Sequence, residues 1–320
     1  MQLVRGLENY HKHGKLHLAL GNFDGVHLGH QILLNQAKTQ AKTQGGKSGV
    51  LIFEPHPLKV LAPQMAPRLL ATPERKLELF AALGLDEVII ADFNHEVAGW
   101  LPGYFVNEIL LGKLGIAGAY VGFNYNFGHK GAGDSALLAT YGQENGFQVE
   151  VIPPVKINDT VVSSTIIRNC LEQGEVDIAR LLLGYTPSLT GRVIEGEKRG
   201  RLIGFPTANI APPVEMLVPK TGVYAAMIKL TNRLFPAVLN IGQKPTFHEE
   251  YPLTIEAHLI GYQGEFYQQT VEAFLIKRLR SEIKFTSAQS LISQINQDIG
   301  AAVQEIEAWQ PTQLEQSWVS

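Results

Sequence analysis

Short apolar runs alternate with helical patterns along the first half of the chain, and this alternation constrains the fold more than any other feature. The apolar runs are separated by segments with the period of amphipathic helices, which is typical of strand–helix–strand units around a parallel sheet. We therefore predict an α/β doubly wound, Rossmann-like domain over residues 1–184. Its expected strands are 16–23, 49–53, 86–93, 117–123 and 148–152, and its expected helices are 29–43, 73–83, 103–112, 134–144 and 164–183.

The pattern changes after Gly184, where the segment YTPS (185–188) has the composition of a linker. The rest of the chain contains strand patterns separated by turn signals and little helix, which favours a closed or nearly closed antiparallel barrel. We predict a six-stranded antiparallel β-barrel with a C-terminal helix over residues 185–320. Its expected strands are 188–196, 206–210, 222–230, 236–242, 253–261 and 270–280, followed by a helix over 287–307.

Composition and charge limit the classes of protein to which the chain can belong. The residues are 45% hydrophobic and 18% charged, as in globular proteins, and the net charge of −3 offers no basic surface for nucleic acid or anionic membranes. Cys170 is the only cysteine, which excludes an intrachain disulfide, and no apolar run approaches the ~20 residues that span a bilayer. The N-terminal residues lack a signal-peptide pattern. We expect a soluble, cytoplasmic protein with small-molecule substrates that binds neither nucleic acid nor membranes; a homo-oligomer stays open.

The segment GNFDGVHLGH (21–30) lies between the first expected strand and the first expected helix. Ligands bind beyond the carboxyl ends of strands in doubly wound sheets, and the free N–H groups of a helix N-terminus attract phosphate. His27 and His30 lie three residues apart and share one helix face, while Gly25 and Gly29 allow close approach of the backbone. The pattern is compatible with a triphosphate site, a metal site or two surface histidines, and the spacing alone does not choose among them.

The tetrapeptide HLGH (27–30) resembles the HisXxxGlyHis signature of the nucleotidyltransferase superfamily, whose members attack the α-phosphate of ATP and release pyrophosphate. The longer segment 21–30 resembles, more narrowly, the adenylyltransferase domain of the bifunctional riboflavin kinase/FMN adenylyltransferases, the prokaryotic FAD synthetases. The resemblance implies a nucleotidyltransferase fold for the first domain. Further segments resemble motifs of that family in the same order: FEPHP (53–57), VGFNYNFG (121–128), GAGD (131–134) and SSTIIR (163–168).

The resemblance also assigns residues to this first site. Residues 163–165 can cap a helix and donate to phosphate, and Arg168 adds a planar fork of donors. Asn124 and Ile166 depart from the family pattern, where aspartate and arginine are common. The implied ATP- or phosphate-binding residues are Gly21, Asn22, Phe23, Asp24, Gly29, Ser163, Ser164, Thr165 and Arg168, and the implied flavin- or nucleotide-binding residues are His56, Asn124, Phe127 and Asp134.

Two other segments resemble nucleotide-binding motifs without the structural context of those motifs. The segment GGKS (45–48) has Ala41 where a P-loop has its first glycine, and it precedes an expected strand, whereas a P-loop follows one. The segment GAGDSA (131–136) fits a loose dinucleotide fingerprint, but no expected strand immediately precedes it. We expect neither segment to act as an independent phosphate-binding loop.

The segment GEKRGRLIGFPTANI (196–210) combines three glycines with one lysine and two arginines. Backbone freedom and positive charge suit a phosphate-binding flap, although a basic surface turn has the same composition. Thr207 and Asn209 lie two residues apart on an expected strand and therefore share a face. A hydroxyl and an amide oxygen can hold Mg²⁺, which also takes phosphate oxygens and water.

This segment resembles the riboflavin kinase domain, and the next motifs of that domain follow as GVYAA (222–226), NIGQKPTF (240–247), EAHL (256–259) and RSEIKF (280–285). The resemblance implies that Thr207 and Asn209 are the Mg²⁺ ligands and that Glu256 is the general base, where the strand pattern alone gives a solvated residue. Residues 261–262 and Gln268 depart from the family pattern. The implied ATP- or flavin-binding residues are Gly196, Lys198, Gly200, Arg201, Gly204, Phe205, Pro206, Tyr224, Asn240 and Arg280.

Both resemblances together imply a bifunctional enzyme of flavin cofactor biosynthesis. The second domain would phosphorylate riboflavin with ATP and Mg²⁺ to give FMN. The first would transfer AMP from a second ATP to FMN, giving FAD and pyrophosphate, with His27 and His30 as catalytic residues.

Three alternatives remain open. A nucleotidyltransferase acting on a pantetheine or nicotinate nucleotide leaves the barrel motifs unexplained. An aminoacyl-tRNA synthetase can carry a related HisXxxGlyHis motif, but the near-neutral charge disfavours it. A non-enzymatic flavin-binding protein is disfavoured because His27, His30, Thr207, Asn209 and Glu256 are all retained.

Overall fold

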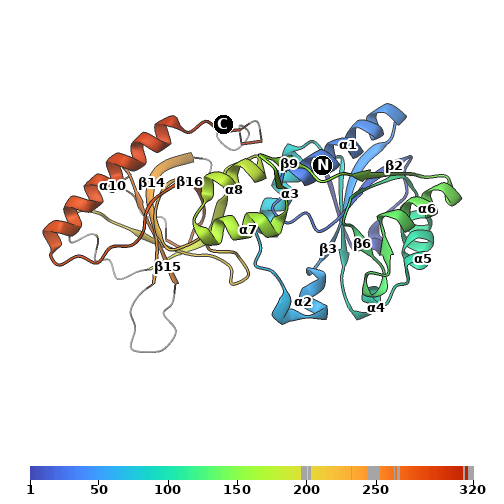
Figure 1. Ribbon diagram of the computed structural model, residues 1–320, viewed down its shortest axis with the longest axis horizontal. Helices are drawn as coiled ribbons and strands as arrows, with labels where there is room; N and C mark the ends of the chain where they lie inside the picture. The colour runs from blue at the N-terminus through green and yellow to red at the C-terminus, as the bar shows by residue number, and fades with distance from the viewer. Residues whose placement is uncertain are drawn as a thin grey trace. The chain divides into compact units, whose positions relative to one another are not determined.

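The computed structural model shows a helix-covered parallel sheet and a β-barrel with a long helix beside it (Figure 1). Residue contacts divide the chain into two compact units, and each is described here by itself. The first unit contains residues 1–68 and 73–163, and the second contains residues 69–72 and 164–320. The residues that the structure describes are 1–195, 200, 203–231, 233–243, 253–262, 264, 267–312 and 314–315.

This division differs from the boundary expected after residue 184. Residues 164–184 belong to the second unit because their helices pack against the barrel. The Nζ atom of Lys277 in the barrel forms an ion pair with Asp177 at 2.5 Å. The N–H of Lys220 donates to the carbonyl oxygen of Leu171 at 3.0 Å. The linker-like segment 185–188 is thus internal to a compact unit.

The first unit is built on a six-stranded sheet with the order β1-β4-β3-β2-β5-β8. All neighbouring strands are parallel, which confirms the doubly wound α/β prediction. Strands β3 and β5 flank β2 on opposite sides, so the switch point of the sheet lies at the carboxyl end of β2. The strands are β1 (Gln2–Arg5), β2 (Leu16–Leu20), β3 (Lys47–Glu54), β4 (Glu87–Asp92), β5 (Ile116–Gly122) and β8 (Gln148–Ile152).

Burial explains which strands the sequence predicts. Strands β2 and β4 are buried at nearly every position because helices cover both faces of the sheet, so they read as continuous apolar runs. Strand β1 is absent from the prediction because only Val4 of its four residues is buried. It therefore adds an edge strand that carries no periodic signal.

The helices of the first unit lie near their predicted positions. The helix expected over 103–112 is a π-helix, η3 (Phe105–Leu114), which follows the single turn α5 (Pro102–Tyr104). The other helices are α1 (Leu28–Gln44), α2 (Pro57–Leu61), α3 (Pro73–Ala82), α4 (His95–Ala98) and α6 (Ser135–Asn145). The 3₁₀ turns are η1 (Leu7–Asn9), η2 (Pro63–Met65) and η4 (His129–Gly131), and short strand pairs join β6 (Asn126–Phe127) to β7 (Gly133–Asp134) and β9 (Lys156–Ile157) to β10 (Thr160–Val161).

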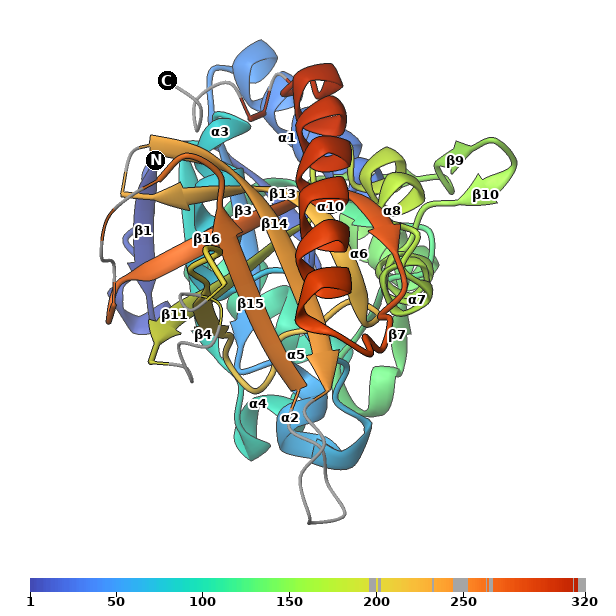
Figure 2. The same ribbon diagram turned by 90° about the vertical axis from the view of Figure 1, so that its left-hand side faces the viewer.

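The second unit contains a closed six-stranded barrel with the order β11-β12-β15-β14-β13-β16. All of its strand pairs are antiparallel, which confirms the predicted barrel. Helix α10 (Ala288–Ala308) packs along the outside of β13 and β14 (Figure 2). The strands are β11 (Ser188–Ile194), β12 (Ala208–Ala211), β13 (Gly222–Leu230), β14 (Arg233–Gln243), β15 (Leu253–Leu259) and β16 (Thr270–Arg280).

The prediction of a single helix over 164–183 is wrong in one respect. It consists of two helices, α7 (Ser164–Gln173) and α8 (Val176–Leu183), which are separated at Gly174. Gly174 has a φ of +81°, a left-handed conformation that ends a helix and that glycine adopts without strain. In the described part of the chain, no helix has both the length and the apolar character needed to cross a membrane.

Candidate active sites

The first site is the turn that joins β2 to α1 at the switch point of the sheet. Phe23 and Val26 have φ values of +52° and +35°, which residues with a Cβ rarely adopt and β-branched residues least of all. Both side chains are fully buried. The buried amide of Gln31 donates to the carbonyl oxygen of Val26 at 2.9 Å. Burial and this hydrogen bond hold the turn in a strained shape, as is common at ligand-binding turns.

His27 caps helix α1 and stacks on His30. The Nδ1 atom of His27 accepts a hydrogen bond from the backbone N–H of His30 at 3.3 Å, so a neutral His27 carries its proton on Nε2. The ring centroids lie 3.6 Å apart and the ring planes differ by 13°. A Cβ at Gly29 would lie only 3.2 Å from the His27 ring, so a larger residue would have to displace the ring by a few tenths of an ångström. The two histidines thus lie together at the helix N-terminus, as their spacing predicts.

Burial determines the charge of His30. Its pKa is lowered well below 6.5 by burial, by the neighbouring His27 and by the positive charge of Lys76, so His30 is neutral at pH 7. The ring of Phe23 packs against it with centroids 5.1 Å apart. Among the residues that the structure describes, none forms a hydrogen bond with the buried Nδ1 atom of His30. His30 therefore offers an anion a neutral ring, and the first amides of α1 offer N–H donors.

His56 connects the segment after β3 to the same turn. Its Nδ1 atom accepts from the N–H of Leu58 at 3.2 Å as the N-cap of α2, which leaves the proton on Nε2. This Nε2 atom lies 3.4 Å from the side-chain nitrogen of Asn22. Because two donors do not face each other favourably, we expect the amide oxygen of Asn22 to occupy that position. His56 thus orients Asn22 within the turn that carries the histidines.

A pocket of about 290 Å³ adjoins the turn, and six of the residues that line it are aromatic. It includes Gly21, Asn22 and Phe127 among the predicted site residues. Burial raises the pKa of Tyr125, so its hydroxyl stays protonated across the physiological range. A pocket with this aromatic lining suits a planar heteroaromatic ring. The aromatic lining residues are Phe53, Phe93, Trp100, Phe105, Tyr125 and Phe127.

Sequence reasoning missed most of this aromatic lining. Phe53 lies near the carboxyl end of β3, and Phe93 follows β4 directly. The carboxyl ends of parallel strands meet at one edge of a sheet, so this position could have suggested both residues. Trp100 lies in the loop between α4 and α5, and Phe105 is the first residue of η3, so neither position carries such a signal.

The other residues predicted for the first site lie at a helix cap, in the turn, on the surface or at the boundary between the units. Asp134 is the N-cap of α6 and accepts from the N–H of Leu137 at 2.8 Å, and Asn124 is exposed. Asp24 is buried in the turn. Ser163 ends the first unit, and α7 begins at Ser164 in the second unit. The phosphate-binding roles of Ser163, Ser164, Thr165 and Arg168 stay predictions.

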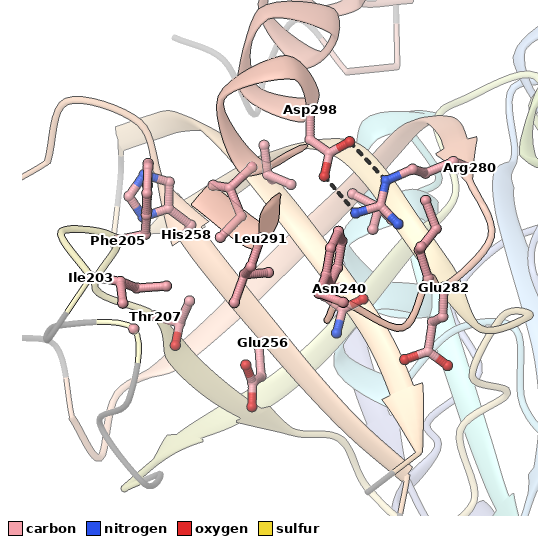
Figure 3. Close-up of a pocket in the computed structure, with 16 residues that line it drawn as sticks. Ile203, Phe205, Thr207, Asn240, Glu256, His258, Arg280, Glu282, Leu291 and Asp298 are labelled. Atoms are coloured by element: carbon pink, nitrogen blue, oxygen red, sulfur yellow. Dashed lines mark hydrogen bonds and ion pairs between the residues drawn. The ribbon is translucent and has the colours of Figure 1, made fainter. Parts of the chain in front are cut away.

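The second site is a pocket of about 380 Å³ on the outside of the barrel, between its wall and α10. Thr207, Asn240 and Glu256 point into this pocket (Figure 3). Alternate strand residues line it, while the residues between them fill the barrel. The lining residues are Gly200, Ile203, Phe205, Thr207, Val223, Val238, Asn240, Glu256, His258, Arg280, Glu282, Ile283, Phe285, Leu291, Ile295 and Asp298.

Strand register places three polar side chains in one row. Asn209 on β12 pairs with Glu256 on β15, and Glu256 pairs with Asn240 on β14. Directly paired residues point to the same side of a sheet, so these side chains are neighbours on the pocket face. Thr207, two residues before Asn209, shares this face.

These oxygen atoms fit a hard divalent cation. Thr207 and Glu256 line the pocket, and Asn209 pairs with Glu256 in the strand register; hydroxyl, amide and carboxylate oxygens are the ligands that Mg²⁺ prefers. Across the described ranges, no three side chains of the His, Cys, Asp and Glu types gather in a metal-binding group. Mg²⁺ would therefore depend on neutral oxygens, on Glu256 and on the phosphates of its ligand.

The segment before Thr207 is fixed by His258. The Nδ1 atom of His258 lies 2.9 Å from the carbonyl oxygen of Pro206 and donates to it. The ring of Phe205 packs edge-on against His258 with centroids 5.6 Å apart. Gly200 and Phe205 line the pocket, and Gly204, directly before Phe205, has a φ of +89°. The predicted residues Gly196, Lys198 and Arg201 lie outside the described residues.

Arg280 lines the pocket, but its guanidinium is engaged within the protein. Its Nε and Nη2 atoms donate to the two carboxylate oxygens of Asp298 at 2.8 and 2.7 Å, and this pair ties β16 to α10. Tyr224 does not reach the pocket. It is fully buried and lies on the opposite strand face from Val223, with its hydroxyl donating to the carbonyl oxygen of Lys220. Strand alternation therefore removes Tyr224 from the ligand-binding set.

Comparison with known proteins agrees with this division of sites. The family described as FAD synthetase matches residues 9–166, and the family described as riboflavin kinase matches residues 183–306. The chain is 37% identical over 303 residues to the bifunctional riboflavin kinase/FMN adenylyltransferase of Pseudomonas fluorescens, covering 94% of this chain and 97% of that one. It is 37% identical to the protein of the same name from Bacillus subtilis, covering 89% and 91%, and 33% identical to that of Escherichia coli K12, covering 93% and 96%.

One solved structure matches nearly the whole chain. It is described as a macrolide-efflux protein from Streptococcus pneumoniae, and it has a TM-score of 0.86 and 26% sequence identity. The match covers 95% of this chain and 99% of that chain. It shows that the same succession of sheet and barrel occurs in another protein of similar length.

Proposed function

The chain belongs to the family of bifunctional riboflavin kinase/FMN adenylyltransferases, and from this premise we propose how its residues make FAD in two ATP-dependent steps. It is an enzyme of flavin cofactor biosynthesis with ATP and flavins as substrates. The observation that best supports the residue roles is the presence of one pocket in each unit. One pocket adjoins the turn that carries the stacked histidines, and the other is lined by Glu256 and Asn240, with Asn209 paired to Glu256 in the strand register.

The barrel carries out the first step. The 5′-hydroxyl oxygen of riboflavin attacks the γ-phosphorus of ATP, the bond to the bridging oxygen breaks with its electron pair, and ADP leaves. Glu256 accepts the proton of the hydroxyl, since it is a carboxylate in the pocket beside the proposed metal ligands. Thr207 and Asn209 would hold Mg²⁺, which neutralises charge on the phosphates. Asn240 borders Glu256 and orients it or the flavin chain.

The first unit carries out the second step. The aromatic pocket holds the isoalloxazine ring of FMN, and a phosphate oxygen of FMN attacks the α-phosphorus of a second ATP. The bond to the bridging oxygen breaks, and pyrophosphate leaves with the electron pair. His27, His30 and the first amides of α1 stabilise the negative charge that develops. Asn22 and His56 shape the turn.

A timed assay tests this proposal. The full chain is incubated with riboflavin, ATP and Mg²⁺, and the flavins are separated over time. FMN should appear first and FAD second, and FMN supplied directly should also become FAD. The same assay without Mg²⁺ should give neither product. Absence of both products, or adenylylation of a pantetheine or nicotinate nucleotide in place of FMN, would reject the assignment.

The variant His30→Ala separates the two sites. It removes a ring beside the proposed triphosphate site, and the loss of one such stabilising group typically costs ~10²–10³ in rate. FAD formation should fall by that factor, while riboflavin phosphorylation in the same chain should not change. Near-normal FAD formation by this variant would reject a catalytic role for His30. We also infer a cytoplasmic location, because both steps consume ATP. We expect no nucleic-acid partner, because the net charge of the chain is −3.

A further inference from the structure

Lys76 on α3 is the cationic side chain that the structure places at the histidine turn without any sequence motif. Its Nζ atom lies 3.4 Å from the carbonyl oxygen of Asn22, the second residue of the turn. Its charge reaches His30, where it helps to lower the pKa of the imidazole. Lys76 therefore faces the residues proposed to bind the triphosphate.

The environment of Lys76 is unusual for a lysine. The side chain is half-buried, and burial lowers its pKa, while Asp24 and Glu54 raise it. Over the described part of the chain, no ion pair forms to Lys76, and the long contact to Asn22 is its one hydrogen bond. By contrast, Lys47 and Lys277 form ion pairs with carboxylates at 2.8 and 2.5 Å. A partly dehydrated ammonium with unused donors costs free energy unless an anion binds to it.

The chemistry of the turn requires such a cation. His30 is neutral, so it cannot supply a full positive charge to the triphosphate. When the bond between the α-phosphorus and the bridging oxygen breaks, an additional negative charge collects on the departing pyrophosphate. A fixed cation stabilises this charge more strongly than neutral N–H donors do.

We propose that Lys76 binds the β- and γ-phosphates of ATP in the first unit and stabilises the pyrophosphate as it leaves. This role rests on the proposed adenylyl transfer. Lys76 forms no covalent bond and exchanges no proton in the step. Its three N–H donors replace the water that the phosphates lose, and the contact to Asn22 keeps the ammonium directed at the turn.

Two substitutions and a matched control test the proposal in the full chain. Lys76→Met removes the charge and keeps an unbranched side chain, and Lys76→Arg keeps the charge. Lys38→Met is the control, because Lys38 is also half-buried in the first unit and donates to a backbone carbonyl, that of Leu83, at 2.6 Å. We expect K76M to lower kcat/KM for ATP in FAD formation by ~10²–10³. K76R should stay within about tenfold of the wild type, and K38M should match it.

Binding measurements separate a phosphate contact from a loss of local structure. Pyrophosphate and AMP serve as probes in calorimetric titrations. K76M should weaken pyrophosphate binding by at least about tenfold and leave AMP binding unchanged, since AMP lacks the phosphates that Lys76 contacts. In NMR titrations, K76M should also raise the pKa of His30, because a neighbouring positive charge is removed.

The outcomes are distinguishable from failure of the proposed function. If the wild type makes no FAD, adenylyl transfer itself is rejected. If the wild type makes FAD and K76M retains full kcat/KM, or if K76M weakens AMP and pyrophosphate equally, the role of Lys76 is rejected and the function stands. Unchanged AMP binding reports that the first unit still folds in each variant. Riboflavin phosphorylation, which uses the other unit, should be unchanged in all three.

Discussion

Single residues in each unit have their chemistry set by their immediate surroundings. In the first unit, stacking and burial keep His30 neutral beside the N-terminus of α1. In the second unit, strand pairing sets Glu256 between Asn209 and Asn240. The same two residue types on an exposed helix or strand would be ordinary surface groups. Position, more than residue type, therefore makes them candidates for catalysis.

Replacing Glu256 with glutamine tests the kinase base. The side chains are nearly isosteric, so strand pairing should persist, but the amide cannot accept the hydroxyl proton. Riboflavin phosphorylation should fall by ~10²–10⁴. FMN supplied directly should still become FAD, because the histidine turn belongs to the other unit. Near-normal FMN production by Glu256→Gln would return this residue to a solvated position on the strand.

Acid should destabilise the first unit through His30. Its pKa is depressed in the folded state and near 6.5 in the unfolded chain, so the unfolded chain binds the proton more readily. The stability is therefore present above pH 6.5 and is lost as the pH falls below that value. Urea midpoints followed by NMR signals of β2 amides should fall from pH 7.5 to pH 5.0. The fall should be smaller in His30→Ala, with the remainder due in part to buried His17, whose pKa burial also lowers. An unchanged fall in that variant would contradict the prediction.

At the scale of elements, helix α10 closes one side of the pocket in the second unit that we propose for the kinase step. Its residues Leu291, Ile295 and Asp298 line the pocket opposite the barrel wall. Asp298 is mostly buried and binds Arg280 of β16 through two hydrogen bonds. This pair fixes the distance between helix and barrel and hence the width of the pocket.

Removing one partner of the Arg280–Asp298 ion pair should lower the free energy of unfolding more than replacing both partners does. Asp298→Ala leaves a partly buried guanidinium without its carboxylate, which typically costs ~3–5 kcal/mol, whereas replacing both partners with apolar residues is often neutral. Thermal unfolding of the second unit should shift strongly in Asp298→Ala and less in the double variant Asp298→Leu/Arg280→Met. FMN formation should follow the same order. Equal destabilisation by the single and double variants would show that the pair does not act as a unit.

At the scale of the whole molecule, the two family matches, over residues 9–166 and 183–306, fall almost entirely in separate compact units. The second unit begins at α7, and its C-terminal residues return to its start. Glu315 is buried and accepts from the N–H of Thr186 at 2.8 Å, and Nε1 of Trp309 donates to the hydroxyl of Thr186 at 2.9 Å. The riboflavin kinase family match ends at residue 306, before Trp309 and Glu315, whose contacts with Thr186 we call the C-terminal clasp.

A fragment of residues 164–320 should therefore fold and make FMN but no FAD. A fragment of residues 187–320 lacks α7, α8 and the clasp to Thr186, so it should unfold at a lower temperature. Both fragments lack Leu69, whose N–H donates to the carbonyl oxygen of Glu215 at 2.8 Å, so this loss is shared between them. Melting temperatures and flavin assays on the two fragments test this order. Equal melting temperatures would favour a boundary near residue 185.

Local sequence determined much of this protein. The parallel sheet, the six-stranded barrel and the C-terminal helix follow from the periodicity of apolar residues. The spacing of these residues along a strand or helix indicates whether one face or both faces are buried. The histidine turn and the Thr207–Asn209 pair follow from short contiguous motifs. Such features depend on spacing within a few residues, so they can be predicted before the fold is known.

Only the tertiary structure decided the features that form where segments far apart in the sequence come into contact. The aromatic pocket draws on β3, β4, η3 and the segment near β6, and Lys76 reaches the turn from α3. His30 is neutral because the packed first unit buries it. Tyr224 does not line the pocket of the second unit, because alternate residues of a barrel strand point to opposite faces. Helices α7 and α8 join the barrel through contacts far along the chain, such as Asp177 to Lys277. Burial, register and charge at a site arise from long-range packing, and no window of neighbouring residues contains them.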